Sequence, residues 1–150
     1  MRLLICGGRH FDDAARIEIE LSLLHAISPV SVIIHGGLPG IGVASEVWAR
    51  KNNVHVIRYP ANFSLGKSGD STRDEFMLAD SRADTLLIFP GGRRTAELLR
   101  EASRELLRIV FATDVQPESL PLPVTLAGEG GLNPDRCTLP IDRERQLLTI

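Results

Sequence analysis

Cysteine is scarce in this chain. Its 150 residues include two cysteines, Cys6 and Cys137, which lie far apart in the sequence. This usage excludes a disulfide-rich scaffold and a cysteine-based zinc site, and it favours a reducing cytoplasm as the location. We expect neither a metal site nor a bound cofactor.

The sequence also has no long apolar run, few aromatic residues and no large excess of charge of either sign. The formal net charge is −2, from 17 basic and 19 acidic residues, so no overall field attracts nucleic acid or an anionic membrane. No apolar run approaches the roughly 20 residues of a membrane span. Two glycines follow the first apolar stretch too closely for a signal peptide. We therefore expect no membrane partner, and the composition does not favour a nucleic-acid partner.

Glycine, in contrast, is placed where predicted strands end. Apolar runs predict strands at residues 2–6, 30–34, 54–59, 85–89 and 108–112, and segments with helical periodicity separate them. This alternation predicts an α/β fold with a doubly wound, mostly parallel, five-stranded Rossmann-like sheet. The expected strand order is 3-2-1-4-5, with the switch point between the first and fourth strands.

The stretch from Asp84 to Glu97 contains the clearest binding signal. An apolar strand runs into Pro90-Gly91-Gly92, and Thr95 is the expected N-cap of the helix that follows. A helix N-terminus after a glycine turn points free backbone N–H groups at one spot and favours an anion such as phosphate. Arg93 and Arg94 oppose the helix dipole by roughly 0.3–1 kcal/mol each, so their position makes more sense if an anion lies between them and the helix.

Three glycine turns are expected to meet at one edge of the sheet. Parallel α/β sheets bind ligands at the carboxyl ends of strands beside the switch point. Arg73 is predicted to open a helix over residues 73–83, next to a flexible loop at 60–72, and to reach the ligand as an exposed cation whose removal barely changes stability. The candidate ligand-binding residues are Gly7, Gly8, Arg9, His35, Gly36, Gly37, Arg73, Gly91, Gly92, Arg93, Arg94 and Thr95.

Two common nucleotide motifs fit poorly. Gly40-Ile41-Gly42 matches the dinucleotide fingerprint only in part and follows the second strand, and His35 stands where an acidic residue would hold a ribose. The chain contains Gly66-Lys67-Ser68, but Ala61 stands where the P-loop pattern Gly-x-x-x-x-Gly-Lys-Ser/Thr requires its first glycine, so the full motif is absent. A dehydrogenase and a P-loop NTPase are therefore not favoured.

Several motifs together resemble those of a known family. They are Cys6-Gly7-Gly8-Arg9-His10-Phe11, His35-Gly36-Gly37 with Gly40, Val47-Trp48-Ala49, and Phe89-Pro90-Gly91-Gly92-Arg93 with Thr95-Ala96. The chain resembles the YspA-type, cpYpsA-related branch of the SLOG superfamily over roughly residues 2–112. The resemblance implies a nucleotide-binding domain related to the LOG phosphoribohydrolases and more distantly to the DNA-processing protein DprA. It also implies nucleotide-derived ligands such as ADP-ribose or NAD metabolites, and we expect a homo-oligomer such as a dimer.

The chain departs from the family pattern at functional positions. Gly40-Ile41-Gly42 replaces the usual Gly-Ala-Asp, Asp74 follows Arg73 where Asn is usual, and Arg94 replaces a glycine. The catalytic glutamate of LOG enzymes falls on Leu98, while Glu97 lies about 100° around the helix. We therefore favour a binding or sensing module. The alternative is an N-glycosidase acting on nucleoside 5′-monophosphates, with Arg73 and Glu97 as candidate catalytic residues, and a DNA-binding role ranks third.

The end of the chain differs in composition from the rest. Residues 113–150 contain five of the nine prolines. We expect a SLOG-like nucleotide-binding domain at residues 1–113 and an arm at residues 114–150 that packs on the same domain or on a partner subunit.

Overall fold

The computed structural model describes residues 1–61 and 63–112, without the side chains of residues 63, 65 and 67. The predicted arm at residues 114–150 lies outside the described residues.

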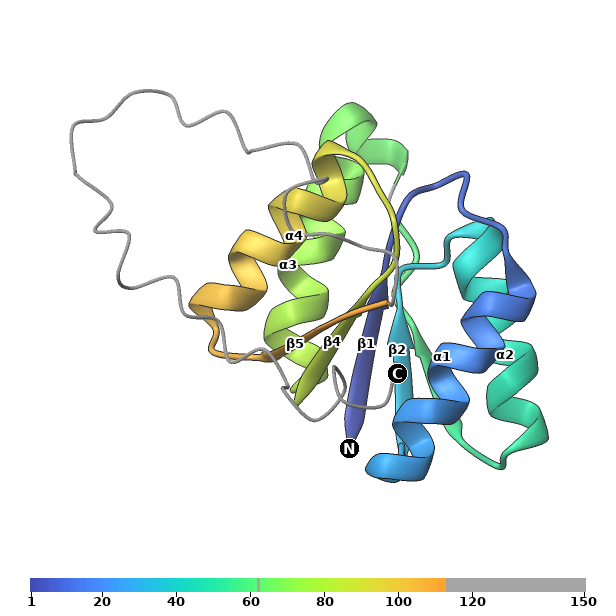
Figure 1. The fold of residues 1–150 in the computed structure, drawn as a ribbon. Helices are drawn as coiled ribbons and strands as arrows, with labels where there is room; N and C mark the ends of the chain where they lie inside the picture. The colour runs from blue at the N-terminus through green and yellow to red at the C-terminus, as the bar shows by residue number, and fades with distance from the viewer. Residues whose placement is uncertain (62, 113–150) are drawn as a thin grey trace.

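A five-stranded parallel sheet forms the centre of the fold (Figure 1). Its strands are β1 (Arg2–Cys6), β2 (Val32–His35), β3 (His55–Arg58), β4 (Thr85–Ile88) and β5 (Arg108–Phe111). The order is β3-β2-β1-β4-β5, and every neighbouring pair is parallel. The predicted fold class, strand order and switch point between β1 and β4 are confirmed.

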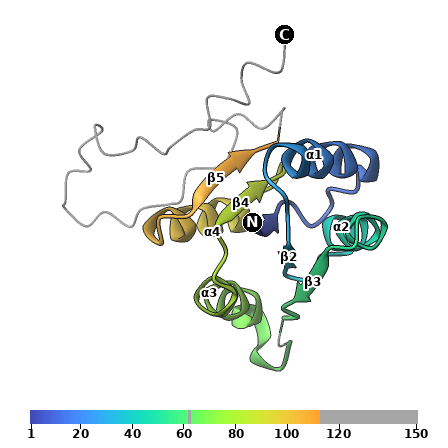
Figure 2. The same cartoon turned by 90° about the horizontal axis from the view of Figure 1, so that it is seen from below.

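Helices cover both faces of the sheet. The helices α1 (Ala14–Ile27) and α2 (Pro39–Lys51) lie on one face, and α3 (Gly69–Ser81) and α4 (Arg93–Arg104) lie on the other (Figure 2). A short 3₁₀ helix, η1 (Phe63–Ser68), leads into α3. This arrangement follows from right-handed crossovers that proceed in opposite directions from β1. In the described part of the chain, no helix has both the length and the apolar character needed to cross a membrane.

The core divides into two apolar layers because successive strand residues point to opposite faces of the sheet. Leu3 and Ile5 of β1 pack in the layer beneath α1 and α2. Leu4 and Cys6 of the same strand pack in the layer beneath α3 and α4. Burial on both faces explains why the central strands are nearly continuous apolar runs in the sequence.

Two helices begin earlier than the sequence predicts. The helix α4 begins at Arg93 with Gly92 as its N-cap, so the prediction that Thr95 is the N-cap is wrong. The helix α3 begins at Gly69, so Arg73 lies one turn inside it, and much of the predicted loop at residues 60–72 is helical. These errors share a cause, since neither observed N-cap makes a side-chain hydrogen bond that a sequence pattern would reveal.

The helix α2 begins at Pro39. Proline is well suited to the first turn of a helix because its missing N–H has no intrahelical acceptor there. Gly40 and Gly42 consequently lie inside the helix. A side chain at Gly40 would collide with the backbone carbonyl of Phe11, so close packing accounts for this glycine.

Candidate functional site

A cleft of about 600 Å³ lies at the carboxyl ends of the central strands. It is formed where the turns after β1, β2 and β4 meet α3 and the N-terminal part of α4. Its lining residues are Ile5, Cys6, Gly7, Gly8, Arg9, His10, Phe11, Gly36, Leu38, Arg73, Asp74, Met77, Pro90, Gly91, Gly92, Arg93, Arg94, Thr95 and Leu98. The volume is within the usual range of small-molecule sites.

The turns after β1 and β4 are in direct contact. The N–H of Gly8 donates a hydrogen bond of 2.8 Å to the carbonyl of Pro90. A Cβ atom at Gly91 would lie 2.7 Å from the amide nitrogen of Gly8 and would also collide with the hydroxyl of Thr95. Both turns therefore require glycine for packing within the protein, and the amide of Gly8 already has an acceptor.

Gly92 differs from these glycines because it faces open space. A Cβ atom added there would meet nothing within 4 Å among the atoms of the described residues. Gly92 is the N-cap of α4, and the next three residues form the first helical turn. First-turn N–H groups have no acceptor within their own helix. The residues that the structure describes thus give no steric reason for this glycine, whereas the close approach of a ligand to the helix N-terminus would.

Charged residues from three elements form a network at the cleft. Asp70 accepts a hydrogen bond from Arg9 at 3.2 Å and ion pairs with Arg73 at 3.5 Å and with Arg94. Asp74, one turn further along α3, accepts from Nε of Arg73 at 2.6 Å and from Nη2 of Arg94 at 3.1 Å. The network joins the β1 turn and the start of α4 to α3, and three arginines against two aspartates leave one net positive charge.

Arg73 is buried, in contrast to the exposed cation that the sequence predicts. The residue is 9% exposed, and its guanidinium group also donates to the carbonyl of Gly36. The space beside Gly36 is filled by that guanidinium group, which a side chain at this position would displace. Arg73 therefore holds the β2 turn against α3 in addition to lining the cleft, and the expectation that its removal barely changes stability does not fit this burial.

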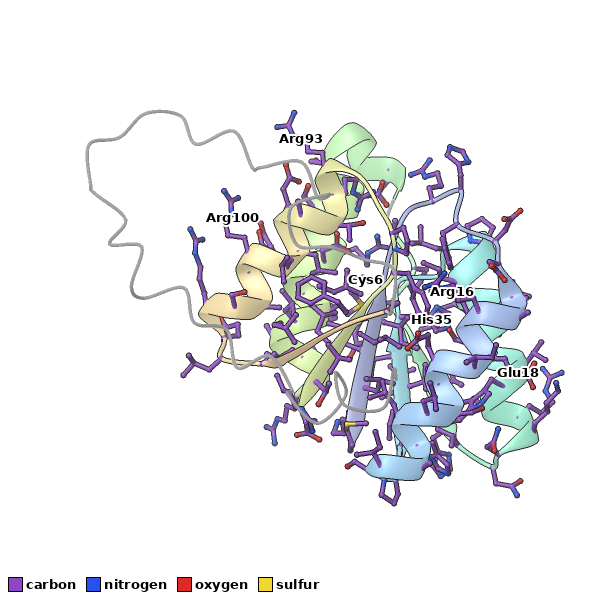
Figure 3. The ribbon with its side chains drawn as sticks, in the orientation of Figure 1. Cys6, Arg16, Glu18, His35, Arg93 and Arg100 are labelled. Atoms are coloured by element: carbon purple, nitrogen blue, oxygen red, sulfur yellow. The ribbon has the colours of Figure 1, made fainter. Side chains whose placement is uncertain are left out.

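The two arginines of the α4 first turn have protein carboxylates as partners. Arg93 is exposed and pairs with Glu97 at 3.0 Å, and Figure 3 shows it projecting away from the body of the protein. Arg94 pairs with Asp70 and Asp74. The anions inferred from the unfavourable position of these arginines at a helix start are thus, at least in part, side chains of this chain.

His35 and Gly37 do not line the cleft, although both are among the predicted site residues. The buried imidazole of His35 accepts a hydrogen bond from the N–H of Gly37 at Nδ1, which assigns the proton to Nε2 and makes it the donor to Glu46 at 2.9 Å. Gly37 has a φ of +79°, a left-handed conformation that favours glycine. His35 therefore supports the turn from beneath.

The pKa of His35 is set by its surroundings. Burial lowers it below the ordinary value of 6.5 and outweighs the opposing attraction of Glu46, while Arg58 and Arg73 lower it further. The pKa of Glu46 is also lowered, chiefly by the hydrogen bond that Arg58 donates. The lowered pKa of His35 keeps the imidazole neutral and able to accept from Gly37, while the ionised Glu46 accepts the hydrogen bond from Nε2.

The acidic residue that lines the cleft is Asp74, which the sequence-based list of site residues omits. Leu98 lines the cleft, whereas Glu97 does not. This matches the 100° rotation per residue expected on a helix. Cys6 also lines the cleft, but burial and the nearby Asp74 raise the pKa of its thiol and leave it unsuited to act as a nucleophile.

The structure brings most predicted site residues together. All of them except His35, Gly37 and the catalytic candidate Glu97 line the same cleft. Sequence reasoning missed the apolar wall of Phe11, Leu38, Met77 and Leu98, because apolar residues carry no distinctive signal until their surroundings are known. Asp74 had a usable signal, its position in a motif where the resembled family has Asn. In the described part of the chain, no group of acidic, histidine or cysteine residues is arranged to hold a metal ion.

Fold and cleft together define a Rossmann-like parallel α/β protein with a candidate ligand site at the topological switch point. Residues 1–66 match the model of the YspA, cpYpsA-related SLOG family, so the SLOG resemblance is confirmed for that part of the chain. The matched residues include the turns after β1 and β2, and the turn after β4 lies beyond them. No curated protein and no solved structure matches the chain.

The lowered pKa of His35 predicts a pH-dependent stability. Because its folded-state pKa lies below 6.5, the stabilisation is present above that pH and is lost as the pH falls, since the unfolded state then binds the proton more readily. The free energy of unfolding should therefore decrease between pH 7 and pH 5, and Glu46 should add a further loss below pH 4.5. Urea unfolding between pH 7 and pH 4 measures the free energy of unfolding and tests this prediction, with the His35→Gln variant as the comparison. Parallel curves for both proteins above pH 5 would contradict the prediction.

The burial of Arg73 predicts a stability cost when it is truncated. Arg73→Ala leaves the Gly36 carbonyl and one Asp74 oxygen without a donor, which should lower the free energy of unfolding by about 1–3 kcal/mol. Arg93→Ala is the matched control, because its exposed side chain makes one i,i+4 ion pair worth about 0.2–0.5 kcal/mol. Equal melting temperatures for the two variants would show that Arg73 does not support the fold.

Proposed function

We propose that this protein binds a nucleotide or a nucleotide derivative in the cleft and acts as a binding or sensing module. The observation that carries the proposal is the open backbone at Gly92, beside the first turn of α4 and next to a cleft of ligand size. A helix N-terminus in this setting favours a phosphate group. The SLOG family match is consistent with a small-molecule ligand.

The walls of the cleft suit the two ends of such a ligand. The phosphate would lie against the backbone of Gly91 and Gly92 and the first turn of α4, where Thr95 is buried and lines the cleft. The apolar side chains of Phe11, Leu38 and Leu98 provide surface for a base or sugar ring. This combination of a polar end and apolar walls is typical of small-molecule sites.

A LOG-like N-glycosidase is the second candidate, because Asp74 places one carboxylate in the cleft. Such an enzyme needs an acid positioned to activate water at the bond that breaks. Leu98 occupies the position of the LOG catalytic glutamate. Glu97 does not line the cleft and forms an ion pair with Arg93. The arrangement therefore favours binding without turnover.

A substitution at Gly92 tests the phosphate site. Gly92→Ala adds a methyl group that meets no described protein atom, so the unliganded protein should still fold, with a loss of about 0.5–1 kcal/mol because alanine is a poorer N-cap than glycine. The same methyl group would occupy the space through which a phosphate approaches, so the dissociation constants of AMP and ADP-ribose should rise at least tenfold, which corresponds to about 1.4 kcal/mol. Calorimetric titration provides the measurement.

The control is Leu106→Ala, which changes a 90% exposed side chain beyond the C-terminal end of α4 and should not alter binding. Unchanged affinity in Gly92→Ala, with measurable binding in the unsubstituted protein, would exclude a phosphate at this turn. A ligand-soaked crystal structure with density only at other surfaces would exclude it as well.

Turnover is expected to be very slow or absent. Without a positioned general base, the rate should be roughly 10²–10⁴-fold below that of a competent enzyme. Chromatography of AMP, GMP and CMP after long incubation should show no release of base and ribose 5-phosphate beyond the no-protein control. Release at ordinary enzymatic rates would overturn the prediction, and comparing Glu97→Gln with Asp74→Asn would then identify the carboxylate responsible.

A further inference from the structure

Asp74 is the acidic residue of the cleft lining, and two arginines hold it in place. Its side chain is 13% exposed. Oδ1 accepts from Nε of Arg73 at 2.6 Å, and Oδ2 accepts from Nη2 of Arg94 at 3.1 Å. The carboxylate is therefore fixed in position by one guanidinium group from its own helix and one from α4.

Each oxygen of this carboxylate retains acceptor capacity. An ionised carboxylate offers about four lone-pair positions, two on each oxygen. Among the residues that the structure describes, the hydrogen bonds to Asp74 use one position on each oxygen. A pair of adjacent acceptors remains, and a pair of neighbouring hydroxyl groups can donate to them together.

The position of Asp74 relative to the proposed phosphate site is set by Arg94. Arg94 lies in the first turn of α4, and its guanidinium group reaches across to Asp74 on α3. The acid thus lies beside the helix N-terminus that would receive the phosphate. The two paired arginines offset the repulsion between a carboxylate and a nearby phosphate.

We propose that Asp74 determines sugar specificity by accepting hydrogen bonds from the vicinal 2′- and 3′-hydroxyl groups of a ribose, so that the cleft selects ribonucleotides over deoxyribonucleotides. This inference rests on the proposed nucleotide-binding function. Asp74 and Arg94 come from two different helices, both line the cleft, and they contact each other there. The pair therefore forms one structural unit particular to this cleft.

Asp70 offers a matched control for Asp74. It lies one turn earlier on the same helix and also pairs with Arg73 and Arg94, but it does not line the cleft. Its replacement should disturb the arginines without removing an acceptor for the sugar. A change in overall affinity can therefore be separated from a change in the preference between ribose and deoxyribose.

The experiment measures the dissociation constants of AMP, 2′-deoxyAMP and 3′-deoxyAMP by calorimetric titration at fixed ionic strength. The unsubstituted protein should bind AMP about tenfold or more tightly than either deoxy compound, because each lacks a donor to a charged acceptor. Asp74→Asn should reduce this ratio to about threefold or less, since the amide keeps only one acceptor oxygen. Asp70→Asn should keep the ratio of the unsubstituted protein.

The outcomes separate the two proposals. Equal affinity for AMP and its deoxy analogues in the unsubstituted protein would overturn the role of Asp74 while leaving nucleotide binding intact, and so would an unchanged ratio in Asp74→Asn. If none of the three nucleotides nor ADP-ribose binds, the proposed function is overturned together with the inference. Circular dichroism tests whether each variant folds. If Asp74→Asn does not fold, the ratio of deoxyAMP to AMP dissociation constants is compared between the unsubstituted protein and Asp74→Glu. A reduced ratio is expected for Asp74→Glu, because its carboxylate is displaced.

Discussion

The site depends on the close contact between the turns after β1 and β4, in which the Gly8 amide donates a hydrogen bond to the Pro90 carbonyl. The turns after β1 and β4 meet at the point where the chain reverses its direction across the sheet, and they approach so closely that Gly91 has no room for a side chain. Their contact places the N-terminus of α4 at one wall of the cleft, while Arg73 holds the β2 turn at another. Gly92 alone among these turn glycines of β1 and β4 is left facing open space.

The charged residues beside the turns after β1 and β4 determine how the cleft could bind an anion. Three arginines and two aspartates form one network, so the cleft is not a simple array of unpaired cations. The backbone at the start of α4 supplies directional N–H groups, and the network supplies a single net positive charge. Ligand binding would consequently depend on the shape of the turn at least as much as on the arginine side chains. This also separates Arg73, which is buried and supports the β2 turn, from the exposed Arg93.

The positions of the acidic residues on and near α4 bear on whether the cleft is suited to ligand binding or to catalysis. On α4, Leu98 lines the cleft, whereas Glu97 does not and pairs with Arg93. Asp74 lines the cleft from α3, and its carboxylate accepts hydrogen bonds from Arg73 and Arg94. A carboxylate held in this way is well placed to recognise hydroxyl groups. The residues that resemble a hydrolase motif thus surround a site whose arrangement suits recognition.

The sequence by itself determined the parallel sheet, its order and the edge where the glycine turns gather, because apolar runs buried on both faces and right-handed crossovers leave few alternatives. It did not reveal that α4 begins at Arg93, that Arg73 is buried against Gly36, or that Arg94 meets Asp74. The last two of these facts depend on contacts between residues about 20 to 40 positions apart. Periodicity and turn chemistry act over a few neighbouring residues, whereas the partners of a charged side chain are decided only when distant segments pack together.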